Sequence, residues 1–341
     1  MTAPANSFLT PSLADADYWR GKLVVVTGGS GFIGSHLVER LLPLAASVVV
    51  PTRQAGTPRF LRALAGEVEV LQGDLCEEAF ARSVMKGADT ALLLAATVGG
   101  IQWNMAHPGS VFRDNMRAFL GSLDGARLEG VGRVLITSSA CVYPRECLIP
   151  TPESEGFRDR PEQTNEGYGW AKRMEEYLGA AYAEEFGMSI AVARPYNAYG
   201  PRDDFDPVSC HVIPALIRKA CDPEAEELLV WGSGQQSRSF LYVTDFADGL
   251  IRICERASDA QPTNVGADQE TSIGALSELL VELSETKKRI VFDTTKPEGQ
   301  PRRHCDTSLL QDRYDFQARV SLADGLRETV RYFREEVEGR S

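Results

Sequence analysis

Three side chains able to transfer or stabilise protons follow one another in the middle of the sequence. Ser139 closes an apolar, strand-like run, and Tyr168 and Lys172 stand four residues apart further along the chain. That spacing puts the phenol and the ammonium group on one face of a helix. A nearby cation favours the phenolate, so we expect Lys172 to lower the pKa of Tyr168 toward neutral pH, where the phenol exchanges a proton with a hydroxyl or carbonyl group.

A glycine-rich turn precedes these residues, between the apolar run Leu23 to Thr27 and a helical pattern. Glycines spaced three residues apart at such a junction allow a tight turn, let backbone N–H groups approach a pyrophosphate, and let the helix pack closely on the strand. We therefore predict a nicotinamide dinucleotide site here, with a purely structural turn as the alternative. The predicted contacts of this segment are Gly28, Gly31, Phe32, Ile33 and Gly34.

The end of the second predicted strand decides between NAD and NADP. An acidic residue there bonds the ribose 2′-hydroxyl of NAD, whereas an arginine accommodates the 2′-phosphate of NADP. No acidic residue occurs between Glu39 and Glu67, but Arg53 does. We expect NADP, with Arg53 at the 2′-phosphate, and keep NAD as the alternative. The further predicted cofactor contacts follow the third and fourth strands and are Asp74, Leu75 and Ala95.

The elements that must position these side chains alternate between apolar strands and amphipathic helices. The predicted strands are Leu23 to Thr27, Ser47 to Val50, Val68 to Gln72, Thr90 to Ala95, Arg133 to Thr137 and Ile190 to Arg194. The predicted helices between them include Gly34 to Leu44, Pro108 to Glu129 and Gly169 to Phe186. Alternation of this kind predicts an α/β fold with a Rossmann-type, doubly wound parallel sheet.

The pattern changes along the chain and predicts three parts. Residues 1–18 are polar and aperiodic, which indicates a mobile or draped N-terminal arm. Residues 19–196 form the predicted dinucleotide-binding domain, to which residues 240–262 return. Loops interrupted by proline and glycine then favour a smaller α/β lobe for substrate binding, over residues 197–239 and 263–341.

Composition excludes several classes of function. The chain has 341 residues, a formal net charge of −12 and a pI near 5.0, whereas binding to nucleic acid or anionic membranes through charge needs a basic face. Its 7 cysteines form no Cys-x-x-Cys pair, so we expect neither a disulfide framework nor a metal site, and a reducing, cytoplasmic setting. No apolar run approaches the ~20 residues of a membrane span, and we expect no targeting signal.

The ordered set of glycine turn, serine, tyrosine and lysine resembles the extended short-chain dehydrogenase/reductase (NAD-dependent epimerase/dehydratase) family over nearly the whole chain. Two further segments, Arg194 to Pro201 and Trp231 to Asp245, are also similar to sequence motifs of that family. The resemblance implies that Ser139 hydrogen-bonds the reacting oxygen and that Tyr168 is the acid or base. It implies that Lys172 holds both the tyrosine and the nicotinamide ribose.

Within this family the chain is most similar to GDP-L-fucose synthases and then to GDP-mannose 3,5-epimerases. The segments in which this similarity is found are Ala96 to Ile101, Ser139 to Pro144, Asn165 to Tyr168 and Cys210 to Leu216. The likeness implies that Cys141 and His211 invert carbons 3 and 5 of a 4-keto sugar before the ketone is reduced. The residues alone leave alternatives open: Cys141 as a small buried side chain and His211 as a helix-start histidine bonding a backbone carbonyl.

Substrate contacts are expected from amide and cationic side chains, namely Asn197, Lys219, Arg238, Lys296 and Arg302. The resemblance places Asn197 and Arg238 at the diphosphate of a sugar nucleotide, and the other three supply positive charge unless they are solvated surface groups. Gly167 and Ser239 depart from the synthase pattern, which leaves the nucleotide base and the sugar open.

The sequence thus predicts a nucleotide-sugar 3,5-epimerase/4-reductase that takes hydride from NADPH. One alternative is an NAD-dependent 3,5- or 4-epimerase with no net redox change. Another is a catalytically inactive dinucleotide-binding regulatory protein, because a fold alone does not fix a function. The resemblance also implies a homodimer, formed through Pro108 to Glu129 and Gly169 to Phe186 of each subunit.

Overall fold

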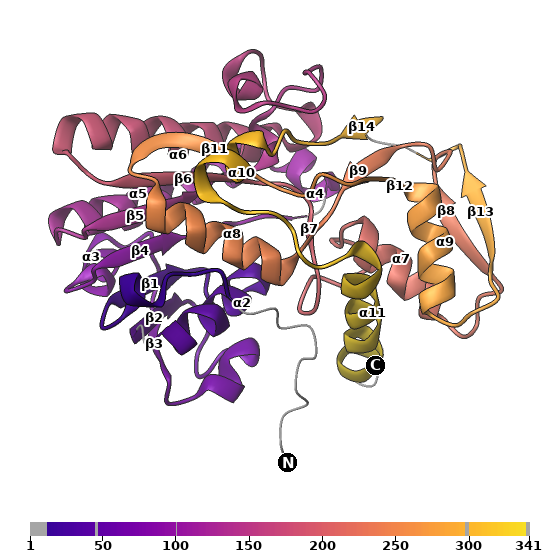
Figure 1. Cartoon of the computed structure of the whole chain (residues 1–341), viewed down its shortest axis with the longest axis horizontal. Helices are drawn as coiled ribbons and strands as arrows, with labels where there is room; N and C mark the ends of the chain where they lie inside the picture. Colours follow the sequence, from indigo (N-terminus) through magenta and orange to yellow (C-terminus); the bar gives the residue numbers. More distant parts are fainter. Residues whose placement is uncertain (1–11, 45–46, 100, 297–299, 339–341) are drawn as a thin grey trace.

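A parallel β-sheet forms the centre of the larger part of the molecule (Figure 1). The computed structural model describes residues 12–44, 47–99, 101–296 and 300–338. Within these ranges the central sheet has seven parallel strands in the order β11-β6-β5-β4-β1-β2-β3. Their bounds are β1 Leu23–Thr27, β2 Ser47–Thr52, β3 Val68–Gln72, β4 Thr90–Leu93, β5 Arg133–Thr137, β6 Ile190–Pro195 and β11 Asp259–Val265.

Helices cover both faces of this sheet, and the strand sequences explain why. Side chains along a strand alternate between the two faces. Val24 and Val26 of β1 pack into one apolar cluster with α2 (Phe32–Leu41) and α8 (Val243–Arg256). Val25 points the other way, into a cluster formed with α3 (Glu78–Met85), α5 (Pro108–Leu128) and α6 (Glu166–Phe186). A strand buried on both faces reads as the continuous valine run seen here.

A smaller lobe, at the right of Figure 1, has its own apolar cluster. Its short strands are β7 Ala198–Tyr199, β8 Glu227–Trp231, β9 Ser237–Ser239, β10 Leu241–Tyr242, β12 Glu270–Ser272, β13 Arg289–Asp293 and β14 Arg302–Arg303. The helices α7 Val212–Cys221, α9 Ile273–Leu283 and α11 Leu322–Tyr332 pack on them. The remaining helices are α1 Ala16–Trp19, α4 Ile101–Ala106 and α10 Ser308–Tyr314. No helix in the described ranges is long and apolar enough to cross a membrane.

The predicted fold class and the six predicted strands are confirmed, with shifts at their ends. The fourth strand ends at Leu93, before the predicted Ala95. The hydroxyl of Thr27 accepts hydrogen bonds from the backbone N–H groups of Leu94 and Ala95 at 3.0 and 3.1 Å, so these two groups turn toward β1. Strand β11 continues to Val265, past the expected boundary at residue 262.

The predicted N-terminal arm lies partly outside the described residues. Ser12 to Trp19 lie against α8, where the Ser12 hydroxyl donates to Asp248 at 3.1 Å and the Trp19 indole donates to Glu255 at 2.6 Å. Trp19 is completely buried at the end of α1. This part of the arm is therefore draped and packed, and it contains a helical turn that the sequence did not predict.

Candidate active site

The glycine turn between β1 and α2 leaves room for an anion at the start of the helix. Gly28 has a φ of +71°, which only glycine adopts without strain. A side chain at position 34 would place its Cβ 2.1 Å from the carbonyl oxygen of Gly28, so helix and turn can approach this closely only with glycine there. Gly31 caps the helix without any side-chain hydrogen bond. The N–H groups of the first helical turn therefore fit the pyrophosphate of a dinucleotide.

Arg53 and Asp74 lie close together beyond the ends of β2 and β3. The backbone N–H of Cys76 donates to the Asp74 carboxylate at 2.9 Å and holds the pKa of that group below its usual value, and the charge of Arg53 lowers it further. The pKa of Asp114, on α5, is lowered mainly by its hydrogen bond with Arg113, and the charge of Arg53 adds to this effect. Arg53, the predicted contact of the 2′-phosphate, is thus exposed beside two carboxylates. It lies past the end of β2, where the adenosine end of a cofactor would lie.

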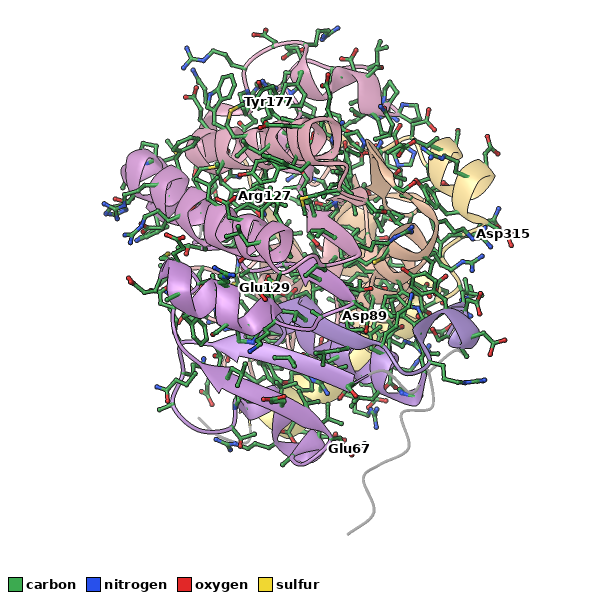
Figure 2. All side chains as sticks on the ribbon, turned by 90° about the vertical axis from the view of Figure 1, so that its left-hand side faces the viewer. Glu67, Asp89, Arg127, Glu129, Tyr177 and Asp315 are labelled. Atoms are coloured by element: carbon green, nitrogen blue, oxygen red, sulfur yellow. The ribbon has the colours of Figure 1, made fainter. Side chains whose placement is uncertain are left out.

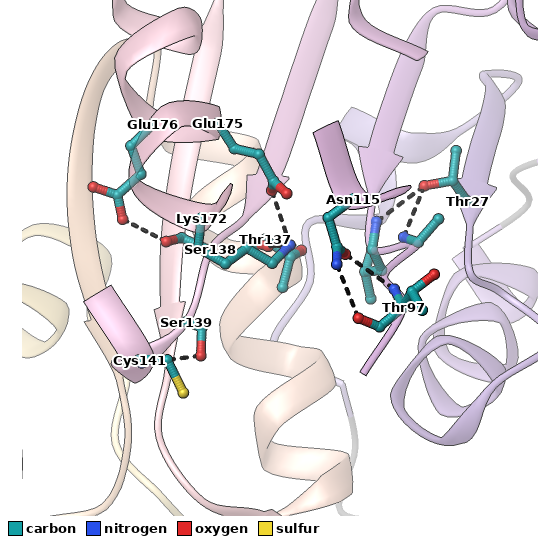
Figure 3. A network of polar contacts seen from close by, with 12 residues as sticks. Thr27, Thr97, Asn115, Thr137, Ser138, Ser139, Cys141, Lys172, Glu175 and Glu176 are labelled. Atoms are coloured by element: carbon teal, nitrogen blue, oxygen red, sulfur yellow. Dashed lines mark hydrogen bonds and ion pairs between the residues drawn. The ribbon is translucent and has the colours of Figure 1, made fainter. Parts of the chain in front are cut away.

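Ser139, Cys141 and Lys172, three of the residues predicted to act in proton transfer, lie near the end of β5 (Figure 3). Ser139 begins the 3₁₀ turn Ala140–Val142, and its hydroxyl accepts a hydrogen bond from the N–H of Cys141 at 3.1 Å. Ser139 also forms a hydrogen bond with the phenol of Tyr168. The Lys172 ammonium lies 5.6 Å from the centroid of the Tyr168 ring. One helix, α6, therefore presents both the phenol and the ammonium group to the serine.

The expectation that the pKa of Tyr168 is lowered toward neutral pH is wrong. Burial of the phenol raises its pKa to about 12, although Lys172 acts in the opposite direction. The negative charge of Glu175 contributes to this increase. Desolvation disfavours the charged phenolate, and here it outweighs the nearby cation. Tyr168 is therefore a protonated phenol at neutral pH, which suits donation of a proton.

Lys172 is held by a partner that the sequence analysis missed. Its side chain is 2% exposed and donates hydrogen bonds to the carbonyl oxygen of Thr137 at 2.9 Å and to the carboxylate of Glu175 at 2.8 Å. Burial alone would lower the pKa of Lys172, but Glu175 more than offsets it, so that the pKa is raised. No sequence signal except the three-residue spacing on one helix could have indicated this pair.

Cys141 lines a pocket beside an arginine that the sequence analysis also missed. The Arg303 guanidinium lies 3.7 Å from the Cys141 sulfur, and both line a pocket with Tyr196 and Glu162. The predicted Arg302 is also one of the residues that line this pocket, but its guanidinium makes two hydrogen bonds with Glu270, at 2.9 and 2.6 Å. Neighbouring side chains on a strand point to opposite faces, so two consecutive arginines signalled that one of them reaches the cysteine.

His211 projects into open space at the start of α7, with 74% of its side chain exposed. Its Nδ1 lies 4.0 Å from the Asp203 carboxylate, which raises the pKa of the histidine, whereas the charge of Arg303 acts in the opposite direction. The imidazole does not cap the helix, so the suggested backbone contact is not seen. Arg303 contacts the Cys141 sulfur and its charge also acts on His211, so the cysteine and the histidine lie in the same region of the molecule.

Two arginines form a positive site on neighbouring strands of the lobe. Arg238 of β9 and Arg303 of β14 are directly paired in register. Burial lowers the pKa of Arg238 to about 10, and the adjacent charge of Arg303 adds to this effect. Like charges held together in a half-buried place fit a bound anion. Asn197 supports this strand by donating from its amide to the carbonyl oxygen of Ser239 at 2.8 Å.

Lys219 and Lys296 flank an exposed aromatic ring rather than the two arginines. Their ammonium groups lie 5.6 and 5.9 Å from the centroid of Trp231, whose side chain is 51% exposed. Lys219 also donates to the carbonyl oxygen of Leu229 at 2.8 Å. An exposed aromatic face beside cations is able to stack with a nucleotide base. Trp231 itself was not predicted as a site residue.

A buried ion pair fixes the segment that carries Ser139 and Cys141. Arg194 of β6 makes two hydrogen bonds with Glu176 of α6, at 2.8 and 2.7 Å, and a third with the hydroxyl of Tyr143 at 3.0 Å. The hydroxyl of Ser138 donates to the same glutamate. Both ends of the Ser138–Tyr143 segment are therefore tied to helix α6 and strand β6, which holds the reactive side chains between them in place.

Comparisons with known proteins agree with the fold described above. The family model for the NAD dependent epimerase/dehydratase family matches residues 24–266. The chain is 34% identical to a dTDP-4-dehydro-6-deoxy-D-allose reductase of Streptomyces bikiniensis, over 94% of this chain and 98% of the reductase. It is 33% identical to a probable GDP-L-fucose synthase of Oryza sativa subsp. japonica, over 93% and 94% of the two chains. The solved structure of a GDP-L-fucose synthetase from Naegleria fowleri bound to NADP has a TM-score of 0.79 and 25% identity, covering 94% of each chain.

Proposed function

The chain belongs to the NAD-dependent epimerase/dehydratase family, and from that premise we propose that it is a nucleotide-sugar 3,5-epimerase/4-reductase using NADPH. Members of this family are NAD(P)-dependent enzymes, and the chain's relatives act on nucleotide sugars. The observation that supports the proposal is that Arg303 contacts Cys141 and acts on His211, while Cys141 lies next to the serine of a second group suited to proton transfer. Ser139, Tyr168 and Lys172 form one set of proposed proton-transfer residues, and Cys141 and His211 form the other.

The first set fits reduction of a ketone. The hydroxyl groups of Ser139 and Tyr168 would bind the carbonyl oxygen, and the protonated phenol would give its proton to that oxygen as negative charge develops. Lys172 would stabilise the phenolate that remains. When bound, the reduced nicotinamide supplies the hydride.

The second set fits inversion beside the ketone. A 4-keto group acidifies the hydrogens on carbons 3 and 5, so a thiolate is able to remove them and leave an enolate. The guanidinium of Arg303, 3.7 Å from the Cys141 sulfur, places positive charge beside the proposed base. Asp203 favours the protonated form of His211, which would return a proton to the opposite face of the ring. Removal and return from different sides invert the carbon.

NADP is the proposed cofactor because Arg53 is exposed beside Asp74 at the end of β2. The residues that would hold the dinucleotide are the glycine turn, Asp74, Leu75, Ala95 and the catalytic tyrosine and lysine. Arg238 and Arg303 would bind the diphosphate of the substrate, and Trp231 its base, with Lys219 and Lys296 at the edge. We place this substrate site in the lobe of residues 197–239 and 263–341, with Asn197 bracing β9.

A second copy of the chain is the proposed partner, docked on α5 and α6. These helices lie side by side on the face shown in Figure 2, with Arg127 at the end of α5 and Tyr177 on α6. The apolar side chains of Phe112, Leu120 and Tyr177 are exposed there. An apolar hollow of about 420 Å³ lies between the two helices, lined by Pro108, Phe112, Glu166, Gly167, Trp170 and Met174.

We propose a cytoplasmic setting, which the free thiols of the 7 cysteines fit.

A 4-reductase without epimerisation is the second candidate, favoured by the 34% identity to the Streptomyces allose reductase. The test incubates the purified protein with a panel of GDP- and dTDP-linked 4-keto-6-deoxy sugars in deuterated water, with and without NADPH. The epimerase/reductase incorporates deuterium at carbons 3 and 5 without NADPH and consumes NADPH when it is added. Reduction with no deuterium at these carbons would replace the proposal by the simple reductase.

A further inference from the structure

Both side chains of the ion pair between Lys172 and Glu175 are buried. Both side chains are exposed by no more than 3%, and the lysine donates to the glutamate at 2.8 Å (Figure 3). Burying two charges costs desolvation energy that such a pair seldom recovers, so a buried ion pair is weak grounds for a purely stabilising role. Its position beside the reacting phenol calls for a role in the chemistry.

The pair holds the ammonium group in one place. Lys172 donates to the carbonyl oxygen of Thr137, at the end of β5, and to Glu175, one turn further along α6. These bonds use two of the three protons of the ammonium group. They fix it between strand and helix, 5.6 Å from the ring centroid of Tyr168.

Glu175 also reduces the positive charge that Tyr168 experiences. Its negative charge is one of the causes that raise the pKa of Tyr168, against the lowering effect of Lys172. The other charged or titratable groups facing this cluster are Glu176 on the same helix, Arg194 from β6 and Cys141 from the turn after β5. Arg194 and Glu176 neutralise each other in their own pair, so Glu175 is the carboxylate that offsets Lys172.

We propose that Glu175 is a positioning residue of the reduction, which fixes the Lys172 ammonium at the end of β5 and offsets part of its charge. The negative charge of Glu175 thereby acts in the same direction as burial and disfavours the phenolate of Tyr168. This inference rests on the proposed reductase function. Because burial raises the pKa of Glu175 to about 7, the offset is present above neutral pH and is lost at lower pH, where the carboxyl group is neutral.

The first test reads the ionisation of Tyr168 without any substrate. The absorbance of tyrosinate is followed against pH in the wild type and in Glu175→Gln, each compared with the same protein carrying Tyr168→Phe. The two differences isolate Tyr168 in each background. Removing the carboxylate should move the titration of Tyr168 about one unit toward lower pH, the usual scale for one neighbouring charge. Glu184→Gln, which removes an exposed carboxylate from the same helix, should leave the titration in place.

The second test reads the same shift in turnover. Reduction needs the phenol and falls at high pH, whereas oxidation of the alcohol product by NADP⁺ needs the phenolate and rises with pH. The pH at which kcat/KM for reduction falls and the pH at which kcat/KM for oxidation rises are both measured. In Glu175→Gln both should move to lower pH by the same amount as the spectroscopic titration. A merely structural role would lower kcat/KM evenly across pH and leave both of these pH values where they are.

The two readouts separate the possible failures. An unchanged Tyr168 titration in a folded Glu175→Gln protein overturns the role of Glu175, whatever the enzyme does. A shifted titration in a protein that reduces no 4-keto sugar supports the role of Glu175 and refutes the proposed function. If Glu175→Gln does not fold, Glu175→Asp withdraws the carboxylate by one methylene, and a Tyr168 titration that does not move down in that variant overturns the inference.

Discussion

The guanidinium of Arg303 lies 3.7 Å from the sulfur of Cys141, while the guanidinium of the adjacent Arg302 pairs with Glu270. A cation beside a thiol favours the reactive thiolate. Arg303→Gln should therefore slow alkylation of Cys141 by iodoacetamide at neutral pH by about tenfold, equivalent to about 1.4 kcal/mol. Peptide mass spectrometry identifies the modified cysteine.

The neighbouring arginine provides the control for this prediction. Arg302→Gln removes the same charge from the adjacent position and should leave the alkylation rate of Cys141 unchanged. Arg303→Lys keeps a cation and should recover part of the rate. Equal rates in the wild type and Arg303→Gln would show that the contact does not activate the thiol.

Tyr168→Phe should separate reduction from epimerisation. The change removes the proton donor but leaves Cys141 and His211 in place, so reduction of a 4-keto sugar should fall by about 10²–10⁴-fold. Exchange of the hydrogens at carbons 3 and 5 with deuterated water should continue. NADPH absorbance measures the reduction, and proton NMR measures the exchange. A variant that loses reduction and exchange equally would contradict the assignment of separate residues to the two activities.

Cys141→Ser should have the opposite effect. A serine hydroxyl is a far weaker base than a thiolate at neutral pH, so the exchange should be largely lost. His211→Asn should still permit proton removal but impair return from the opposite face, and should therefore yield mostly uninverted sugar. NMR coupling constants of the product distinguish the configurations. Native exchange in Cys141→Ser would assign the cysteine to packing alone.

Arg53→Ala should weaken the binding of NADPH by about 1–2 kcal/mol, roughly ten- to thirty-fold, with little effect on NADH. Only NADPH carries the phosphate that the guanidinium would contact. Isothermal titration calorimetry with both cofactors measures the change, and Arg62→Ala, a nearby exposed arginine, is the matched control. Equal weakening of both cofactors would remove Arg53 from the 2′-phosphate site.

Glu175 should make the stability of the fold depend on pH. Its pKa rises from 4.5 to about 7 on folding, so the folded state binds the proton more tightly than the unfolded chain. The stabilisation is complete below pH 4.5 and is lost as pH rises through 7, by about 3 kcal/mol in all. Glu175→Gln lacks this titration, so the wild type should lose stability relative to it between pH 5 and 8 in urea unfolding. A constant difference would contradict the raised pKa.

Local patterns in the sequence determined the fold and the first half of the site. The valine runs of β1 and β2 predicted strands buried on both faces, since burial on both faces leaves only apolar positions. The spacing of Gly28 and Gly34 predicted the turn because a close backbone approach excludes any side chain. The spacing of Tyr168 and Lys172 predicted their common face, which depends only on helix geometry.

Only the tertiary structure decided the ionisation of these groups and the side chains that surround them. The pKa of Tyr168 is raised rather than lowered because desolvation depends on how much chain from elsewhere covers the phenol. Glu175 pairs with Lys172 only because β5 buries them both, and Arg303 reaches Cys141 only because β14 pairs with β9. Burial and contacts between distant segments arise when the chain packs, and no local pattern of residue types encodes their strength.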